Sequence, residues 1–70
     1  MREVVITKEP VQLYKILKFE GVVDSGGRAK TVIAEGLVLV NGEVETRKRR
    51  KILGGDIITF AGDELKMRLC

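Results

Sequence analysis

The segment from Arg47 to Lys51 places five basic residues in succession, in a chain of only 70 residues. Adjacent cations repel one another, so a small domain is destabilised by such a run unless an anion neutralises it. Three of the five are arginines, whose planar guanidinium groups donate paired hydrogen bonds to phosphate oxygens. The chemistry favoured by these residue types at this spacing is the binding of a polyanion.

The side chains that most enzymes and metal sites use are scarce in this sequence. It contains no histidine and a single cysteine, Cys70. Catalytic triads and Cys–His pairs need a histidine, and zinc sites need several Cys or His ligands. The carboxylates of Asp24, Asp56, Asp63 and Glu64 lie in turn-like segments, where such residues form turns and helix caps. We therefore expect no enzyme, no metal site and no cofactor.

The segment GGRAKT, residues 26–31, is reminiscent of a phosphate-binding loop but does not satisfy its pattern. That pattern requires Gly-Lys-Ser/Thr in succession, whereas Ala29 precedes Lys30 here. We therefore reject a nucleotide site. The two glycines leave backbone N–H groups open at a helix start, where the helix dipole attracts anions. Simple flexibility before the helix is the alternative, and both interpretations stay open.

The distribution of charge favours the same class of partner. The net charge is only +3, but seven of the thirteen basic residues lie between Arg28 and Lys51, with Glu35, Glu43 and Glu45 as the acids of that window. A charge run is often just a solvated loop. This run is internal, between a predicted hairpin and a predicted strand, so we expect it to be surface-exposed and to contact nucleic acid. An adaptor that docks the run on an acidic protein partner is the alternative.

The aromatic residues bear on which nucleic acid is bound. There are three, Tyr14, Phe19 and Phe60. Proteins that bind single strands stack bases on exposed aromatic side chains. Phe60 lies in a predicted core strand and Phe19 ends a predicted helix, so at most Tyr14 is free for stacking. Structured RNA, contacted through its backbone and shape, fits this composition better.

A strand and two helices are predicted in the first half of the chain. Residues 3–7, EVVIT, have the β-branched composition of a strand. Pro10 suits the first turn of a helix that runs to about Phe19 and ends at Gly21. Ser25 is the expected N-cap of a second helix. The predicted buried faces consist of Leu13, Ile16 and Leu17 in the first helix and Ala29, Val32 and Ile33 in the second.

Short strands are predicted in the second half, after the second helix stops at Gly36. Asn41-Gly42 separates two β-type runs and is the strongest short-range signal for a hairpin. Residues 54–60, GGDIITF, predict a turn and a strand, and residues 65–69, LKMRL, alternate as a half-buried strand does. The order is β, α, α, β, β, β, β. The fold class is therefore α+β, with two helices packed on a small, mostly antiparallel sheet.

Length and composition predict one domain spanning residues 1–70, and we expect a monomer. The start of the chain has no apolar stretch long enough for a signal peptide, and no run approaches membrane-spanning length. A lone cysteine fits a reducing compartment. We therefore expect a cytoplasmic protein without membrane contact.

The segment SGGRAKTVIAEGLVLVNG resembles the core of the S-four domain, the RNA-binding module named after ribosomal small-subunit protein four. Gly55, Asp56 and Ile58 resemble the closing element of that family, and ETRKRRKI resembles its small stand-alone members, the YbcJ-like proteins. The resemblance extends from about Leu13 to Phe60. The residues that match the family pattern in register are Ser25, Ala29, Ile33, Gly36, Val38, Val40, Asn41 and Gly42.

The resemblance implies a fold in which the two helices and the following hairpin form an L-shaped surface, the αL motif, that grips folded RNA. It implies that basic residues of the helices and of the loop after the hairpin contact phosphate, in ribosomal or transfer RNA for example. The usual arginine after the serine is replaced by Gly26 here, and the nearest arginine is Arg28. The RNA-binding candidates are Lys15, Lys18, Ser25, Arg28, Lys30, Arg47, Lys48, Arg49, Arg50 and Lys51.

Overall fold

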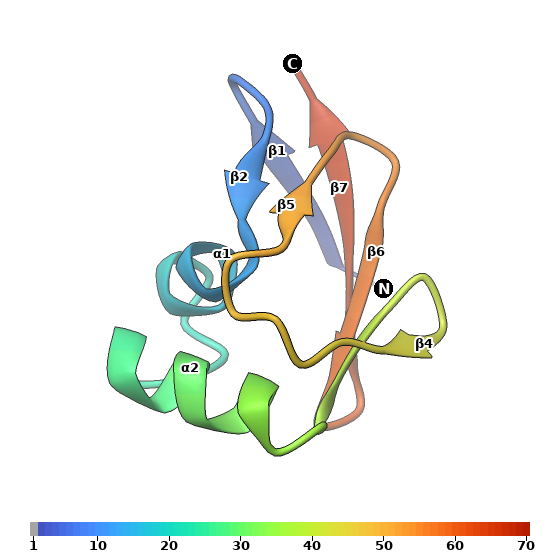
Figure 1. Ribbon diagram of the computed structural model, residues 1–70. Coiled ribbons are helices and arrows are strands. Elements are labelled where there is room, and N and C mark those ends of the chain that lie inside the picture. The colour runs from blue at the N-terminus through green and yellow to red at the C-terminus, as the bar shows by residue number, and fades with distance from the viewer. Residues whose placement is uncertain (1) are drawn as a thin grey trace.

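Two helices pack against one five-stranded sheet in the computed structural model, which describes residues 2–70 (Figure 1). The spatial order of the strands is β1-β7-β6-β3-β4. Their bounds are Arg2–Ile6 for β1, Val38–Val40 for β3, Glu43–Val44 for β4, Ile57–Phe60 for β6 and Asp63–Leu69 for β7. The pairs β7–β6, β6–β3 and β3–β4 are antiparallel, and β1–β7 is parallel. The predicted α+β class with a mostly antiparallel sheet is confirmed.

A second, two-stranded sheet pairs β2 (Val11–Gln12) with β5 (Lys51–Ile52) in antiparallel fashion. The helix α1 (Leu13–Phe19) follows β2 directly, and α2 (Gly26–Ala34) follows after a short connection. In Figure 1 both helices lie to the left of the large sheet, and the chain between β4 and β5 runs above α2 to α1 before it enters β5. The small sheet was not predicted, because strands of two residues leave no period in a sequence.

The core lies between the helices and the sheet. Every residue predicted to form the inner helix faces is buried: Leu13, Ile16, Leu17, Ala29, Val32 and Ile33. In β7 the alternation is also as predicted, since Leu65 and Met67 are buried while Lys66 and Arg68 are exposed. Burial of these aliphatic side chains is the main stabilising contribution to the fold.

The first helix begins later than predicted. Pro10 is exposed and precedes β2, so it does not form the first turn of α1, which starts at Leu13. The backbone of Val11 and Gln12 pairs with Ile52 and Lys51, and residues paired in a ladder cannot also be helical. Tertiary pairing therefore overrides the local preference of the proline.

The predicted turns are confirmed. Asn41 and Gly42 have φ of 53° and 85° and join β3 to β4 as a two-residue hairpin, the conformation that Asn-Gly favours. The Asn41 amide also donates to Asp56 Oδ1 at 3.0 Å and accepts from the Ile57 N–H at 2.9 Å, so the hairpin is fixed to the start of β6. Gly36, with φ of 77°, follows the end of α2.

Within residues 2–70, neither helix has the length and apolar character needed to cross a lipid bilayer.

Candidate nucleic-acid interface

The basic loop, defined as residues 45–51, joins β4 to β5 and includes the first residue of β5; it is organised around one buried carboxylate. Glu45 is 6% exposed and is the only buried charged residue among residues 2–70. Its carboxylate accepts four hydrogen bonds from the loop itself. Arg47 donates from its backbone N–H at 2.9 Å, from Nε at 3.0 Å and from an Nη at 3.1 Å, and Arg50 donates from Nη1 at 2.7 Å. Two of the run's five cations thus share an internal anion.

These bonds shift the pKa values of both partners. The side-chain hydrogen bonds of Arg47 and then of Arg50 lower the pKa of Glu45 from 4.5 to about 2, although burial acts in the opposite direction. The same carboxylate raises the pKa of Arg47. Glu45 is therefore ionised at neutral pH, and it partly neutralises the repulsion within the run.

The basic loop is also fastened to the start of α1. The backbone N–H groups of Leu13 and Tyr14 donate to the carbonyl oxygens of Arg50 and Lys48, at 2.9 and 3.1 Å. The first N–H groups of a helix have no intrahelical acceptor. Gln12, the N-cap residue of α1, makes no side-chain capping bond. The loop therefore supplies the cap, and its position relative to the helix is fixed.

The remaining cations of the loop point to solvent. Lys48, Arg49 and Lys51 are exposed, and no side-chain hydrogen bond or ion pair holds them within residues 2–70. The surface between Arg47, Arg49, Arg50 and Lys51 is hollowed into a shallow depression. Guanidinium and ammonium donors around one depression suit an anion with several acceptor oxygens.

The second helix adds one cation next to this loop. Lys30 Nζ lies 4.8 Å from the centroid of the Tyr14 ring, a distance at which the ring attracts the ammonium group. Tyr14 in turn donates its backbone N–H to Lys48, so a chain of contacts links α2, α1 and the loop. Lys30 is thus held against the helix to which the basic loop is fastened.

The start of α2 is capped as predicted. Ser25 has extended backbone, with φ of −158°, and its hydroxyl accepts from the Arg28 N–H at 3.1 Å. A Cβ atom added to Gly26 would lie 3.6 Å from Cδ of Lys18, so the stem of that lysine from α1 lies against the first turn of α2. At the position where the family pattern has an arginine, the neighbouring cation is therefore Lys18.

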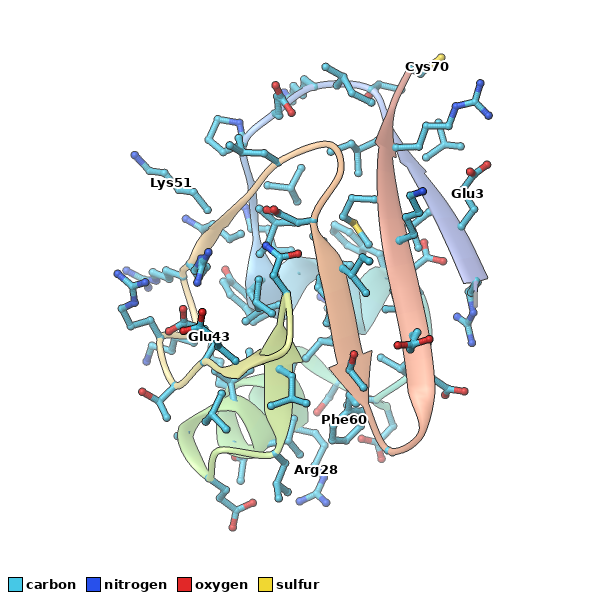
Figure 2. All side chains as sticks on the ribbon, turned by 90° about the vertical axis from the view of Figure 1, so that its right-hand side faces the viewer. Glu3, Arg28, Glu43, Lys51, Phe60 and Cys70 are labelled. Atoms are coloured by element: carbon cyan, nitrogen blue, oxygen red, sulfur yellow. The ribbon has the colours of Figure 1, made fainter. Side chains whose placement is uncertain are left out.

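Two of the candidate residues lie apart from the basic loop. In Figure 2 Arg28 lies at the bottom of the molecule, whereas Lys51 lies on the left edge with the loop. Lys15 lines a groove between α1 and β1. The structure thus links Lys30 to the run through Tyr14, places Lys18 and Ser25 at the start of α2, puts Lys15 in the groove and separates Arg28 from Lys51.

The expected exposure of the run is confirmed for four of its five residues, whereas the Arg50 side chain is only 32% exposed and bonds to Glu45. One expectation from the sequence is wrong. Tyr14 is not the only aromatic residue open to solvent, since Phe19 is 70% exposed while Tyr14 is half-buried under Lys30. Phe19 ends α1 with its ring outside the core.

The structural role of Glu45 in holding the loop was missed in the sequence. One signal was available: a single acid stands two residues before a run of five bases, a spacing at which a carboxylate can accept from the loop's own N–H and guanidinium groups. The contribution of Tyr14 could not be found this way, because it depends on the packing of α1 against α2.

The comparisons with known proteins agree with this geometry. Residues 4–68 match the model of the S4 domain. The "Putative RNA-binding protein YbcJ" of Escherichia coli (strain K12) is 51% identical over 57 residues, which are 81% of each chain. The "Probable ribosome maturation protein RlbA" of Bacillus subtilis (strain 168) is 40% identical over 57 residues, 81% of this chain and 80% of that protein.

A solved structure is also similar. The solution structure of YbcJ from E. coli, described as revealing an alfaL motif involved in RNA-binding, superposes with a TM-score of 0.74 at 45% identity. The match covers 97% of this chain and 87% of that one. With a family match over nearly all of its length, two similar relatives and a similar solved structure, this chain belongs to the S4 domain family.

Proposed function

We propose that this protein binds structured RNA, without catalysing a reaction, through a surface made by Lys30 of α2 and the Arg47–Lys51 run. The observation that supports this most directly is the fixed position of the run. Glu45 holds two of its arginines, and α1 holds its backbone carbonyls. The exposed cations are thus presented on a rigid support.

Rigidity matters because binding is opposed by the entropy of ordering side chains and loops. A flexible basic tail loses that entropy on every contact with phosphate. Here most of the backbone order is already present in the free protein. The rigid arrangement favours a partner whose phosphates are themselves held in a fixed geometry, as in a folded RNA.

The similar proteins also favour RNA as the partner. The E. coli relative is named as an RNA-binding protein, and the related solved structure is described with an RNA-binding motif. The B. subtilis relative is named for ribosome maturation, which makes ribosomal RNA the first candidate to test. The S4 domain is not an enzyme family, which supports binding as the whole activity of this surface.

The proposal is tested by titrating the protein with an RNA stem-loop at several salt concentrations. Four or five neutralised phosphates predict a slope of log K against log salt of about −3 to −4.5. A stem-loop should also compete more effectively than a poly-pyrimidine strand of equal length. A flat salt dependence, or tighter binding of the single strand, would contradict the proposal.

Nuclease treatment of the purified protein, together with competition by another polyanion, separates the alternative of a protein adaptor. If the run docks on an acidic protein, the purified protein should carry no RNA that nuclease can remove, and the stem-loop should bind no better than any polyanion of equal charge. Retention of nuclease-sensitive RNA and preference for the stem-loop support the RNA interface instead.

A further inference from the structure

A mainly apolar groove lies between α1 and the edge strand β1. Its volume is about 550 Å³, and its lining includes Val4, Val5, Ile16 and Phe19. That volume falls within the range of about 300–1,000 Å³ found for ligand sites. Val5 and Phe19 are 56% and 70% exposed, so two large apolar side chains face water beside this groove. Exposed apolar residues gathered around a depression mark interaction sites.

The strand that forms one wall has a free edge. β1 is the end strand of the large sheet, and within the described residues its only strand partner is β7. The Ile6 carbonyl accepts from the Cys70 N–H at 2.8 Å, so the backbone groups of Ile6 face β7. Because these groups alternate along a strand, those of Glu3 and Val5 face the opposite, free edge. They are donors and acceptors ready for another strand.

The charges of the lining residues indicate the chemistry of the occupant. Glu20 is the one acid among them, and Arg2 neutralises it: Arg2 Nη1 donates to the Glu20 carbonyl at 2.9 Å and lies 3.9 Å from its carboxylate. Lys8 and Lys15 also line the groove and are exposed, with no ion pair among the residues that the structure describes. The lining is therefore apolar and positively charged.

We propose that this groove binds an extended segment of an acidic protein partner, which adds a strand to the free edge of β1. Its apolar side chains pack against Val5 and Phe19, and its carboxylates lie opposite Lys8 and Lys15. Addition of a strand to an exposed sheet edge is an established mode of peptide recognition. A second copy of this chain is disfavoured as the occupant, because its own β1 edge, bordered by the same lysines, offers no excess of carboxylates to oppose Lys8 and Lys15.

The free edge of β1 lies away from the basic loop. Figure 2 shows Glu3, whose backbone groups face that edge, on the right and Lys51 on the left. The other end of the groove reaches Gln12, which pairs with Lys51. A strand added beside Glu3 and Val5 would leave Lys51 uncovered, and the protein would then join a protein segment to an RNA. This inference does not depend on the proposed RNA function, because it rests on the edge of β1 and the groove lining and not on the basic loop.

The test uses the full chain, labelled with ¹⁵N, and a synthetic peptide of about six residues in which Glu and Val alternate. A peptide with Lys in place of Glu is the matched control ligand. We expect the Glu-Val peptide to shift the backbone amides of Glu3 and Val5, and the Lys-Val peptide to leave them unchanged. Lys15→Glu should weaken binding by about fivefold or more, since it turns an attraction into a repulsion. Lys66→Glu, an exposed change on β7, should not.

Several outcomes would overturn the inference. These are equal shifts with the Lys-Val peptide, shifts confined to the basic loop, and no shift of the β1 amides at millimolar peptide. A stronger response of the same amides to an oligouridylate would mean that the groove binds nucleic acid. Concentration-dependent dimerisation that shifts these amides without peptide would mean that a second copy occupies it.

Discussion

Replacing Glu45 with glutamine should destabilise the fold, although the two side chains have the same shape. The ionised carboxylate accepts four hydrogen bonds from Arg47 and Arg50. Glutamine keeps one oxygen but turns an NH₂ group, which can only donate, toward guanidinium donors. The donors of Arg47 and Arg50 then lose an acceptor, and the two arginines lose their counter-charge.

The size of the effect follows from the pKa of Glu45. Its lowering from 4.5 to about 2 corresponds to about 3 kcal/mol in favour of the ionised form. The Arg47 side chain is 73% exposed, so water screens part of this interaction, and we expect a loss of about 2 kcal/mol. For a domain of this size that loss lowers Tm by about 8–16 °C.

The assay is thermal unfolding as a function of pH. The folded pKa of Glu45 is depressed, so its contribution is fully present above the unfolded value of 4.5 and is lost as pH falls toward about 2. The parent and the Glu45→Gln variant should therefore differ most near neutral pH and converge in acid. Glu43→Gln, an exposed change on the neighbouring strand β4, is the control and should cost less than about 0.5 kcal/mol. Equal melting of parent and Glu45→Gln at pH 7 would refute the reasoning.

Three further predictions concern the loop and the core. The first replaces with alanine the three solvent-facing cations of the run, Lys48, Arg49 and Lys51. RNA binding should weaken at least tenfold, while the melting temperature should stay within a few degrees, because changes at exposed positions cost little stability. Arg50→Ala should weaken RNA binding and also lower Tm, because the buried carboxylate of Glu45 loses a hydrogen-bond donor. A variant that binds RNA weakly but melts like the parent would contradict a stabilising role of the Arg50–Glu45 bond. Ile33→Ala should lower the free energy of unfolding by about 2–5 kcal/mol, because it opens a cavity in a small core. Denaturant unfolding measures this loss, and a smaller value would mean that the neighbouring side chains fill the cavity.

The features predicted correctly are those with a local cause. Ser25 caps α2 through its own hydroxyl, Asn41-Gly42 forms a hairpin because both residues accept positive φ, and the aliphatic faces of both helices are buried. The start of α1 was predicted wrongly, because the competing partner of residues 11–12 lies some forty residues away in β5. Local rules cannot anticipate such a pairing.

The candidate site also combines features that are visible in the sequence with features that depend on packing. The basic run is visible in the sequence because five charges in succession need no fold to be noticed. Which of them remain free for a partner depends on Glu45, and whether Lys30 joins them depends on Tyr14. Both answers come from packing between segments. The exposure of Phe19 likewise follows from where α1 ends relative to the sheet.

The capping of α1 by the loop makes the first turn of that helix a reporter of loop docking. The amide hydrogens of Leu13 and Tyr14 are shielded by carbonyls that stand about 35 positions further along the chain. Whenever the loop lifts away, those two hydrogens become free to exchange with deuterium, while hydrogens deep within α2 stay protected. A ligand held by the basic loop should slow this exchange at two residues that it does not touch, and the slowing gives the free energy with which the ligand closes the loop.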